Sequence, residues 1–348
     1  MCLNIKMKKF INKKPFFIAE ISANHCGSLS KAMNLIKLAK SKGADAVKLQ
    51  TYTPEMMTIK NLNYKIKNGL WKNLNLWKLY KEAQTPLEWH LPLFKYAKKL
   101  NIKIFSTPFN VDALKFLEKL NCQAYKVASF EMNDLNLIKE IAKTKKPMII
   151  STGLANIKEI ENTYKKAKKF GCEDITLLYC VSNYPSETED FNLNNIRILK
   201  KKFNCKVGLS DHSIGSEIAK LSIAVGAEVF EKHIATQRQK SGHDIKFSAK
   251  GSEIIKYKKD LIDTFRLFQN DNFHRSKKEM KNIIFRRSIY TVKSLKKGDK
   301  FNKNNIKTFR PNIGLSASKY FEILNNKVPY NIKKFTPLKA SILKVKNK

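Results

Sequence analysis

Residues 205–234 read CKVGLSDHSIGSEIAKLSIAVGAEVFEKHI. In this stretch an apolar, β-type run leads into a polar cluster and a helix-like segment, and a second apolar run follows. The same order occurs eight times in the first three quarters of the chain, and the earlier runs are PFFIAEISANH (15–25), ADAVKLQTY (44–52), IKIFSTPF (102–109), CQAYKVASFE (122–131), KPMIISTG (146–153) and DITLLYCVSNY (174–184). Buried parallel strands read as continuous apolar runs, so this alternation predicts a closed (β/α)8 barrel, the TIM barrel. Functional residues are then expected where the strands end.

The chain of 348 residues is longer than the roughly 250 of a typical eight-fold barrel, so one further small domain is expected. Residues 1–268 are predicted to form the barrel, and the polar stretch 269–284 a linker. Residues 285–348 alternate short β-type runs with Gly, Asn and Pro turns, which predicts a small β-rich domain. So short a domain is marginal alone, and we expect it to pack on the barrel or on another subunit.

A long insertion at 52–85 separates the second predicted strand from its helix. It carries several aromatic residues, among them Trp71 and Tyr80. These side chains could form one wall of a sugar pocket, or they could only anchor the loop, and the sequence leaves both readings open.

The formal charge of +39 comes from 68 Lys and Arg against 29 Asp and Glu. The lysines are spread over every predicted helix, which favours solvated helix faces over a nucleic-acid surface. The positive field should still attract small anions.

Six cysteines without paired spacing indicate a reducing compartment. No apolar run approaches the roughly 20 residues of a membrane span, and no export signal is evident, so we expect a cytoplasmic protein without a membrane partner.

Two histidines end neighbouring predicted strands, His212 in GLSDH and His233 in EKH. Adjacent strands lie roughly 5 Å apart, so both imidazoles could reach one ion at the barrel mouth. Two protein ligands leave positions open for water and substrate, as a Lewis-acid site requires. A single histidine here would more often be structural, but the pair favours a divalent metal. Imidazole favours Mn, Fe, Co or Zn over Mg, but availability in the cell decides much, and we expect Mn²⁺ or Mg²⁺, with Co²⁺ as an alternative.

Two lysines, Lys48 and Lys126, lie inside apolar runs where a solvated ammonium group has no place. A buried ammonium must be paired or must bind an anion. Each could be a Schiff-base lysine or an ion-pair partner of Glu20 or Glu131. A phosphate cradle fits better, because hydroxyls accompany them at the strand ends: Ser106, Thr107, Ser129, Ser151, Thr152 and Ser210.

Carboxylates and neutral polar groups are also expected at the mouth of the predicted barrel. Glu20 and Glu131 also end predicted strands, and each could hold water or act as an acid or base. In a purely structural role they would form salt bridges to the lysines. Groups suited to the hydroxyls and amides of a sugar are Gln50, Asn183, Tyr184 and Asp244.

At these residues the chain resembles the sialic acid synthase family. The strings that carry the resemblance are FIAEISANH, GADAVKLQTY, FSTPF, AYKVASFE, IISTG, VSNYP, GLSDH, GAEVFEKH and GHDIKFS. In the tail, RRSIYTVKSLKKGD and FRPNIGLS resemble the antifreeze-like (SAF) domain that closes these enzymes. The likeness runs through essentially the whole chain in order. The strings TYTPEMMT and LYKEAQTPLEWH point to the branch that forms pseudaminic acid.

The resemblance implies a metal-dependent transferase that condenses phosphoenolpyruvate with the open-chain aldehyde of an amino sugar. In the pseudaminate branch the acceptor is 2,4-diacetamido-2,4,6-trideoxy-altrose. Carbon 3 of the enol attacks the aldehyde, whose oxygen the metal polarises. Water then adds at carbon 2, and phosphate departs to leave a nine-carbon 2-keto acid. In the family such acids decorate flagella or surface glycans.

The resemblance also assigns roles to residues. The positions around phosphoenolpyruvate are Lys48, Thr107, Lys126, Ser129, Ser151, Ser182 and Ser210. The metal ligands are His212 and His233, and the acidic pair near the water and cation is Glu20 and Glu131, with their division of labour open. The sugar contacts are Gln50, Tyr184, Asp244 and Arg310, the last reaching across from the partner in a domain-swapped homodimer.

Two alternatives remain beside the pseudaminate assignment. A sibling synthase that uses N-acetylmannosamine or the legionaminic acid precursor would share every catalytic residue. Ser182 stands where neuraminate-forming members have an asparagine, which is consistent with the pseudaminate branch. From another class, a basic barrel that has lost catalysis could bind nucleic acid or sugar. The retained histidines, lysines and glutamates argue against it.

Overall fold

The computed structural model describes residues 10–268 and 272–344. The basic N-terminal segment with Cys2, the first residues of the predicted linker and the last four residues lie outside the described part. The chain divides into two compact units, Met1–Gln269 and Asn270–Lys348.

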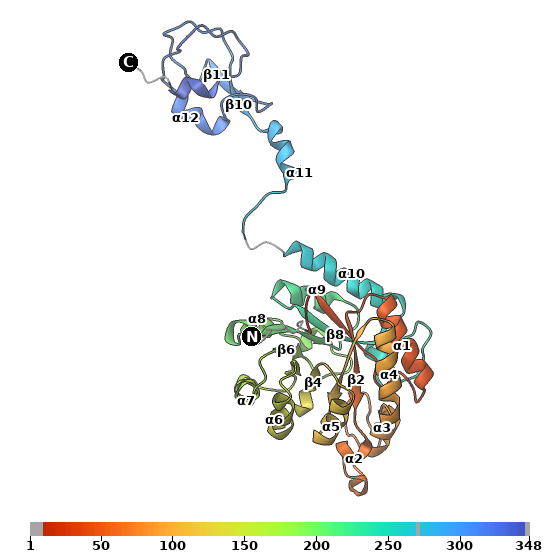
Figure 1. Ribbon diagram of the computed structural model, residues 1–348. Coiled ribbons are helices and arrows are strands. Elements are labelled where there is room, and N and C mark those ends of the chain that lie inside the picture. The colour runs from red at the N-terminus through yellow and green to blue at the C-terminus, as the bar shows by residue number, and fades with distance from the viewer. Residues whose placement is uncertain (1–9, 269–271, 345–348) are drawn as a thin grey trace, which may run out of the picture. The chain divides into compact units, whose positions relative to one another are not determined.

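The first unit is a closed barrel of eight parallel strands, as predicted (Figure 1). Each strand pairs with the next along the chain, and β8 pairs back with β1. The strands are β1 (Phe16–Glu20), β2 (Ala46–Thr51), β3 (Lys103–Pro108), β4 (Tyr125–Val127), β5 (Met148–Ser151), β6 (Ile175–Cys180), β7 (Lys206–Asp211) and β8 (Val229–Ala235). A ninth short strand, β9 (Ala249–Lys250), pairs with the end of β8.

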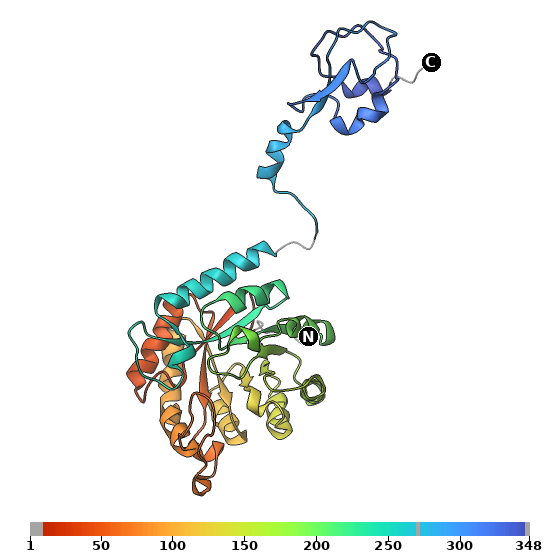
Figure 2. The ribbon, with the colours of Figure 1, turned by 180° about the vertical axis from the view of Figure 1, so that it is seen from behind.

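One long helix follows each strand and covers the outside of the barrel (Figures 1 and 2). In chain order these are α1 (Leu29–Ser41), α4 (Leu87–Lys99), α5 (Val111–Lys119), α6 (Leu135–Lys143), α7 (Ile157–Lys169), α8 (Asn194–Lys202), α9 (Glu217–Ala224) and α10 (Ser252–Leu267). Their apolar faces pack on the strands in one continuous core. Every barrel strand is thus buried on both faces, which explains the unbroken apolar runs.

Side-chain caps set several helix starts. Ser28 accepts a hydrogen bond from Lys31 N, and Asp134 accepts from the first amides of α6. Asn156 and Glu159 form a reciprocal capping box on α7. In α10, Ser252 is the first helical residue, and Gly251, with a φ of +47°, takes the cap position.

The insertion after β2 has its own structure. It contains the short helices α2 (Pro54–Met57) and α3 (Leu76–Ala83), with the 3-10 turn η1 (Lys60–Leu62) between them. A small antiparallel hairpin joins them, since Ile66 N donates to Leu74 O and Leu76 N donates to Tyr64 O.

The second unit has a smaller apolar core, built from ten buried residues that include Ile289, Phe301 and Leu338. Its antiparallel pair is β10 (Ser288–Thr291) with β11 (Ile306–Phe309). The remaining elements are α11 (Lys277–Met280), α12 (Tyr320–Ile323) and the 3-10 turns η5 (Lys281–Phe285), η6 (Ala317–Lys319) and η7 (Ala340–Lys344). The segment expected as an irregular linker therefore holds α11 and most of η5. Across the described residues, no helix is long and apolar enough to cross a bilayer.

Candidate active site

Strand register brings ionisable side chains of β1, β2 and β8 close together. Glu20 on β1 stands opposite Lys48 on β2 and opposite His233 on β8. Ser210 on β7 stands opposite Glu231 on β8. Since side chains alternate between the two faces of a strand, Glu231 and His233 lie on the same face of β8. Side chains of β1, β2, β7 and β8 thus meet in a polar cluster inside the barrel.

Lys48 is the centre of a buried ion-pair cluster. Its Nζ lies 2.6 Å from Glu20 Oε2 and 3.3 Å from Glu231 Oε1, and it donates to Thr107 Oγ1 at 3.3 Å. Glu20 Oε1 accepts from the backbone amide and the hydroxyl of Ser22. The ion pair with Glu20, one of the readings left open by the sequence, is therefore present, and the fully buried Glu20 is held in place.

Lys126 enters the same layer from β4. Its Nζ donates to Ser151 Oγ at 2.5 Å and lies 3.9 Å from Glu231 Oε1. One carboxylate thus faces both buried lysines, and Ser210 Oγ donates to the same oxygen at 3.1 Å. Two ammonium groups and a set of hydroxyls converge here, which is the donor set that a phosphate or carboxylate requires.

Burial and ion pairing shift the pKa values of the charged groups in this cluster. Burial lowers the pKa of Lys126 to about 8, although the charge of Glu231 opposes the shift. Burial alone would lower the pKa of Lys48 too, but Glu20 and Glu231 raise it above its usual value. Burial disfavours ionised Glu231, yet the two lysines outweigh it and hold the pKa of that carboxyl at about 2. Lys126 is therefore the less firmly charged of the two lysines.

The remaining predicted hydroxyls are close by. Ser129 Oγ accepts from Gly153 N at 3.1 Å, and a Cβ on Gly153 would lie 2.3 Å from Ser182 Oγ. The glycine therefore allows the loops after β4, β5 and β6 to approach one another closely. Thr152 donates to Leu178 O and Ser106 contacts Thr51, so these two hydroxyls serve the fold.

Glu131 does not end a strand, as the sequence predicted. It lies beyond the end of β4, in the 3-10 turn η2 (Ser129–Glu131), because the regular pairing of β4 stops at Val127. Burial raises the pKa of its carboxyl to about 7. Among the described residues, its Oε2 atom has no hydrogen-bond partner. Glu131 is thus a carboxyl group whose charge changes near neutral pH, with one oxygen available to a ligand.

The rings of His212 and His233 lie 5.6 Å apart. His212 Nδ1 lies 3.0 Å from the carbonyl oxygen of Val181, the kind of outer partner that a metal-ligating histidine usually has. Asp244 Oδ2 lies 3.2 Å from His233 Nδ1, but among the described residues this nitrogen makes no hydrogen bond. Within the described part of the chain, no group of three or more His, Cys, Asp or Glu side chains could hold a metal. An ion held here would therefore have these two histidines as its protein ligands and its other positions open to water or substrate.

A cavity of about 370 Å³ opens beside this cluster. Of the predicted residues, it is lined by Gln50, Glu131, Tyr184, His233 and Asp244. Asn183 is exposed and does not line it. Arg310 belongs to the second unit and is exposed there.

Sequence reasoning missed two participants, Glu231 and Phe247. Glu231 links both lysines, as described above, and Phe247 packs against both histidine rings at 4.9 and 5.6 Å. The alternation of side chains along a strand could have identified Glu231, because a residue two positions before His233 must point to the same face of the strand. Phe247 follows β8 in a loop, where no periodicity marks it.

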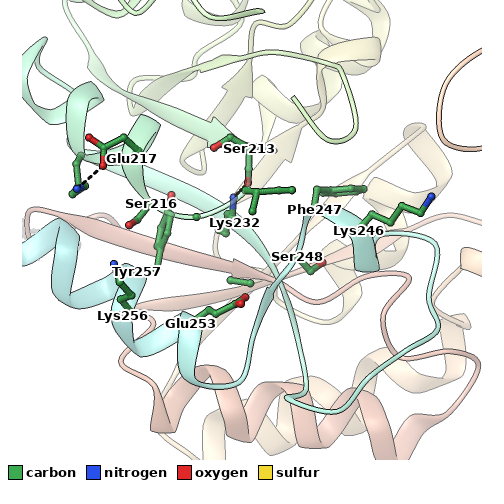
Figure 3. Close-up of a pocket in the computed structure, with 14 residues that line it drawn as sticks. Ser213, Ser216, Glu217, Lys232, Lys246, Phe247, Ser248, Glu253, Lys256 and Tyr257 are labelled. Carbon is green, nitrogen blue, oxygen red and sulfur yellow. Dashed lines mark hydrogen bonds and ion pairs between the residues drawn. The ribbon is translucent and has the colours of Figure 1, made fainter. Parts of the chain in front are cut away.

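A second cavity, of about 430 Å³, lies near α9 and α10 (Figure 3). Three of its lysines are paired: Lys232 with Asp211 at 3.2 Å, Lys220 with Glu217 at 2.5 Å and Lys256 with Asp260 at 2.6 Å. None of the predicted site residues is among the described residues that line it. The predicted site residues that line a cavity therefore line the one at the barrel mouth.

Comparison with known proteins agrees with this geometry. Residues 35–271 match the NeuB family. The chain is 42% identical over 328 residues to a pseudaminic acid synthase of Campylobacter jejuni, covering 92% of this chain and 94% of that protein. It is also 42% identical to a pseudaminic acid synthase of Helicobacter pylori, with coverages of 94% and 97%.

A solved structure shares the fold. The N-acetylneuraminic acid (sialic acid) synthetase of Leptospira borgpetersenii, solved in complex with citrate, superimposes with a TM-score of 0.71 at 32% identity. The match covers 78% of this chain and 91% of that one. The resemblance noted in the sequence is confirmed: this chain belongs to the NeuB family, the family of the sialic acid synthases.

Proposed function

We propose that this chain is an enzyme that condenses phosphoenolpyruvate with the open-chain aldehyde of 2,4-diacetamido-2,4,6-trideoxy-altrose and water to give pseudaminate and phosphate. The observation that carries the proposal is the 42% identity to pseudaminic acid synthases across more than nine tenths of both chains. The buried lysines, the histidine pair and the cavity beside them supply the groups that this reaction needs. We place the reaction in the cytoplasm, where phosphoenolpyruvate is made.

Lys126 and the surrounding hydroxyls are the proposed anchor for phosphoenolpyruvate. Its ammonium lies within 2.5 Å of Ser151 Oγ, so a phosphate or carboxylate oxygen could bridge the two groups. Lys48 is already neutralised by Glu20 and Glu231, and we assign it to holding these carboxylates and Thr107 in place. Ser129, Ser182 and Ser210 complete the anion site.

Carbon 3 of the enol attacks the aldehyde carbon, and the positive centre that develops at carbon 2 takes up water. A carboxylate must accept a proton from that water. Glu20 is occupied by Lys48 and Ser22, whereas Glu131 has a free oxygen and a pKa near 7. We therefore assign proton transfer to Glu131 and stabilisation of the positive centre to Glu20. Phosphate then leaves from carbon 2.

His212 and His233 are the proposed ligands of a divalent metal, Mn²⁺ or Mg²⁺ with Co²⁺ as an alternative. When bound there, the ion would supply Lewis-acid polarisation of the aldehyde oxygen. Gln50, Tyr184 and Asp244 line the neighbouring cavity and are proposed to hold the amides and hydroxyls of the sugar.

The second unit is proposed to be an antifreeze-like (SAF) domain, with the barrel at 1–268, the linker at 269–284 and the SAF domain at 285–348. Arg310 lies near exposed apolar residues, since Phe309 is 40% and Ile313 61% exposed. Exposed apolar patches mark interaction sites. We propose that Arg310 reaches the sugar of a partner's barrel in a domain-swapped homodimer, where its planar fork suits an amide.

Phosphate release from phosphoenolpyruvate tests the reaction. Purified protein with Mn²⁺ is incubated with the 2,4-diacetamido-altrose, with its legionaminate-precursor isomer and with N-acetylmannosamine. The highest kcat/KM is expected with the altrose. The alternative function of a legionaminic acid synthase is supported by a relative, because the chain is 36% identical to an N,N'-diacetyllegionaminic acid synthase of C. jejuni. Best turnover of another acceptor would replace the proposed one, and no phosphate release together with tight DNA binding would favour a non-catalytic basic barrel.

A further inference from the structure

The insertion after β2 supplies an apolar wall to the active-site cavity. Six apolar residues between α2 and the end of α3 line it: Met57, Ile66, Trp71, Leu76, Leu79 and Ala83. They come from all parts of the insertion, namely α2, the hairpin and α3. The barrel and its loops supply the charged and amide groups of the lining, Gln50, Glu131, Asp244 and His233, together with further apolar side chains such as Phe109 and Phe247, and the insertion also adds Tyr80 on α3.

Contacts hold this wall against the barrel mouth. Trp71 Nε1 donates to the backbone oxygen of His243 at 3.2 Å, and His243 Nε2 lies 3.2 Å from Glu82 Oε2 on α3. The Trp71 ring also packs on Tyr184, with ring centroids 5.2 Å apart. The hairpin and α3 are thus both tied to the loop that carries Asp244. The sequence left open whether these aromatics form a pocket wall or anchor the loop, and Trp71 does both.

We propose that the insertion 54–83 is the specificity element of this site, and that Met57 and Ile66 select acceptor sugars that present methyl groups over sugars that present hydroxyls. This inference rests on the proposed function and names which residues choose its acceptor. A trideoxy diacetamido sugar carries three methyl groups, on carbon 6 and on two acetamides. Ile66 has no side-chain hydrogen-bonding group for a hydroxyl in those places, and Met57 has only a weakly accepting thioether sulfur.

The physical basis is desolvation. A methyl group that leaves water for an apolar wall gains free energy in proportion to the area buried. A hydroxyl in the same place loses its water partners without replacement, which costs free energy. One group in an apolar pocket typically changes kcat/KM by about tenfold or more, so a wall that meets several methyl groups can separate related sugars.

Two substitutions test the wall. Met57→Gln keeps the length of the side chain and adds an amide, and Ile66→Ser adds a hydroxyl in the hairpin. Both side chains are half-buried in a surface insertion, so the barrel core is untouched. The matched control is Ile59→Ser, in the same insertion but 72% exposed and outside the cavity lining. The readout is the ratio of kcat/KM for 2,4-diacetamido-2,4,6-trideoxy-altrose to that for N-acetylmannosamine, with thermal unfolding to verify folding.

Each test variant is expected to lower this ratio by about tenfold, and Ile59→Ser is expected to leave it unchanged. An unchanged ratio in both test variants, with phosphate release retained, would overturn the inference while leaving the reaction intact. An equal loss toward both acceptors would also overturn it, because the residues would then matter for activity and not for choice. No phosphate release by the unaltered protein with any acceptor would instead overturn the reaction itself, and this inference with it.

Discussion

The imidazole rings of His212 and His233 lie 5.6 Å apart, although His212 directly follows β7 and His233 lies within β8, two residues before the end of the strand. His233→Ala or His212→Ala is expected to lower kcat by roughly 10²- to 10³-fold, because a bound ion contributes several kcal/mol of charge stabilisation. Phosphate release and binding of Mn²⁺ by calorimetry measure the two effects.

Metal removal gives the matching experiment without a mutation. Treatment with a chelator followed by gel filtration should abolish phosphate release, and Mn²⁺, Mg²⁺ or Co²⁺ should restore it to different extents. Full activity in chelated protein whose metal content is verified as zero would contradict the assignment of the histidines.

Lys126 gives the second prediction. Lys126→Met is expected to raise the KM for phosphoenolpyruvate by about 10- to 100-fold, since a hydrogen bond to a charged group contributes roughly 1.5–3 kcal/mol. The KM for the sugar should change less, because Lys126 does not line the cavity. Steady-state kinetics with each substrate varied in turn separates the two constants.

The control for this experiment is Lys232→Met. Lys232 is also buried, but its ammonium pairs with Asp211 at 3.2 Å and the side chain lines the other cavity. Loss of this pair is expected to lower the free energy of unfolding by about 3 kcal/mol and to leave the KM for phosphoenolpyruvate unchanged. Equal KM values for Lys126→Met and the unaltered protein would count against the anion site.

The barrel could be predicted because each strand is buried on both faces and therefore appears as an apolar run. Lys48 and Lys126 stood out for the same reason, since a charge inside such a run demands a partner. Glu231 was overlooked because it stands between Phe230 and Lys232, and neighbouring residues on a strand point to opposite faces. In the sequence, only the alternation of side chains along the strand shows that Glu231 and Lys232 point to opposite faces. Glu231 faces Lys48, and Lys232 faces Asp211.

Loop geometry was harder to predict. The sequence placed Glu131 at a strand end, but β4 is only three residues long and a 3-10 turn carries the carboxylate. The contact of Trp71 with His243 joins residues 172 positions apart, and short-range patterns carry no trace of such a pairing. The sequence therefore offered the insertion as a possible wall of a pocket but could not show which of its residues line the cavity, whereas the groups on the strands could be placed from the strand pattern.

The pH profile of kcat/KM for phosphoenolpyruvate is the third prediction. Below pH 7 the Glu131 carboxyl is protonated and cannot accept a proton, so the rate should fall roughly tenfold per pH unit on that side. Above pH 8 the Lys126 ammonium loses its proton and the anion site its charge. A bell with limbs near these values is expected. Glu131→Gln should remove the acidic limb, and an unchanged acidic limb in that variant would show that another group carries it.

Arg310 gives the last prediction, which tests the proposed exchange of domains. Arg310→Ala and His233→Ala are each expected to be inactive alone. If the arginine acts on a partner's barrel, half of the dimers in an equal mixture are mixed, and one of their two sites has both groups intact. About a quarter of the unaltered activity should therefore return after subunit exchange.

The matched control mixes His233→Ala with Lys126→Met. Both defects lie in the barrel, so every site of a mixed dimer keeps one defect and no such recovery is expected. Absence of recovery in the first mixture, with exchange verified by native mass spectrometry, would place Arg310 and the barrel of its own chain in one site.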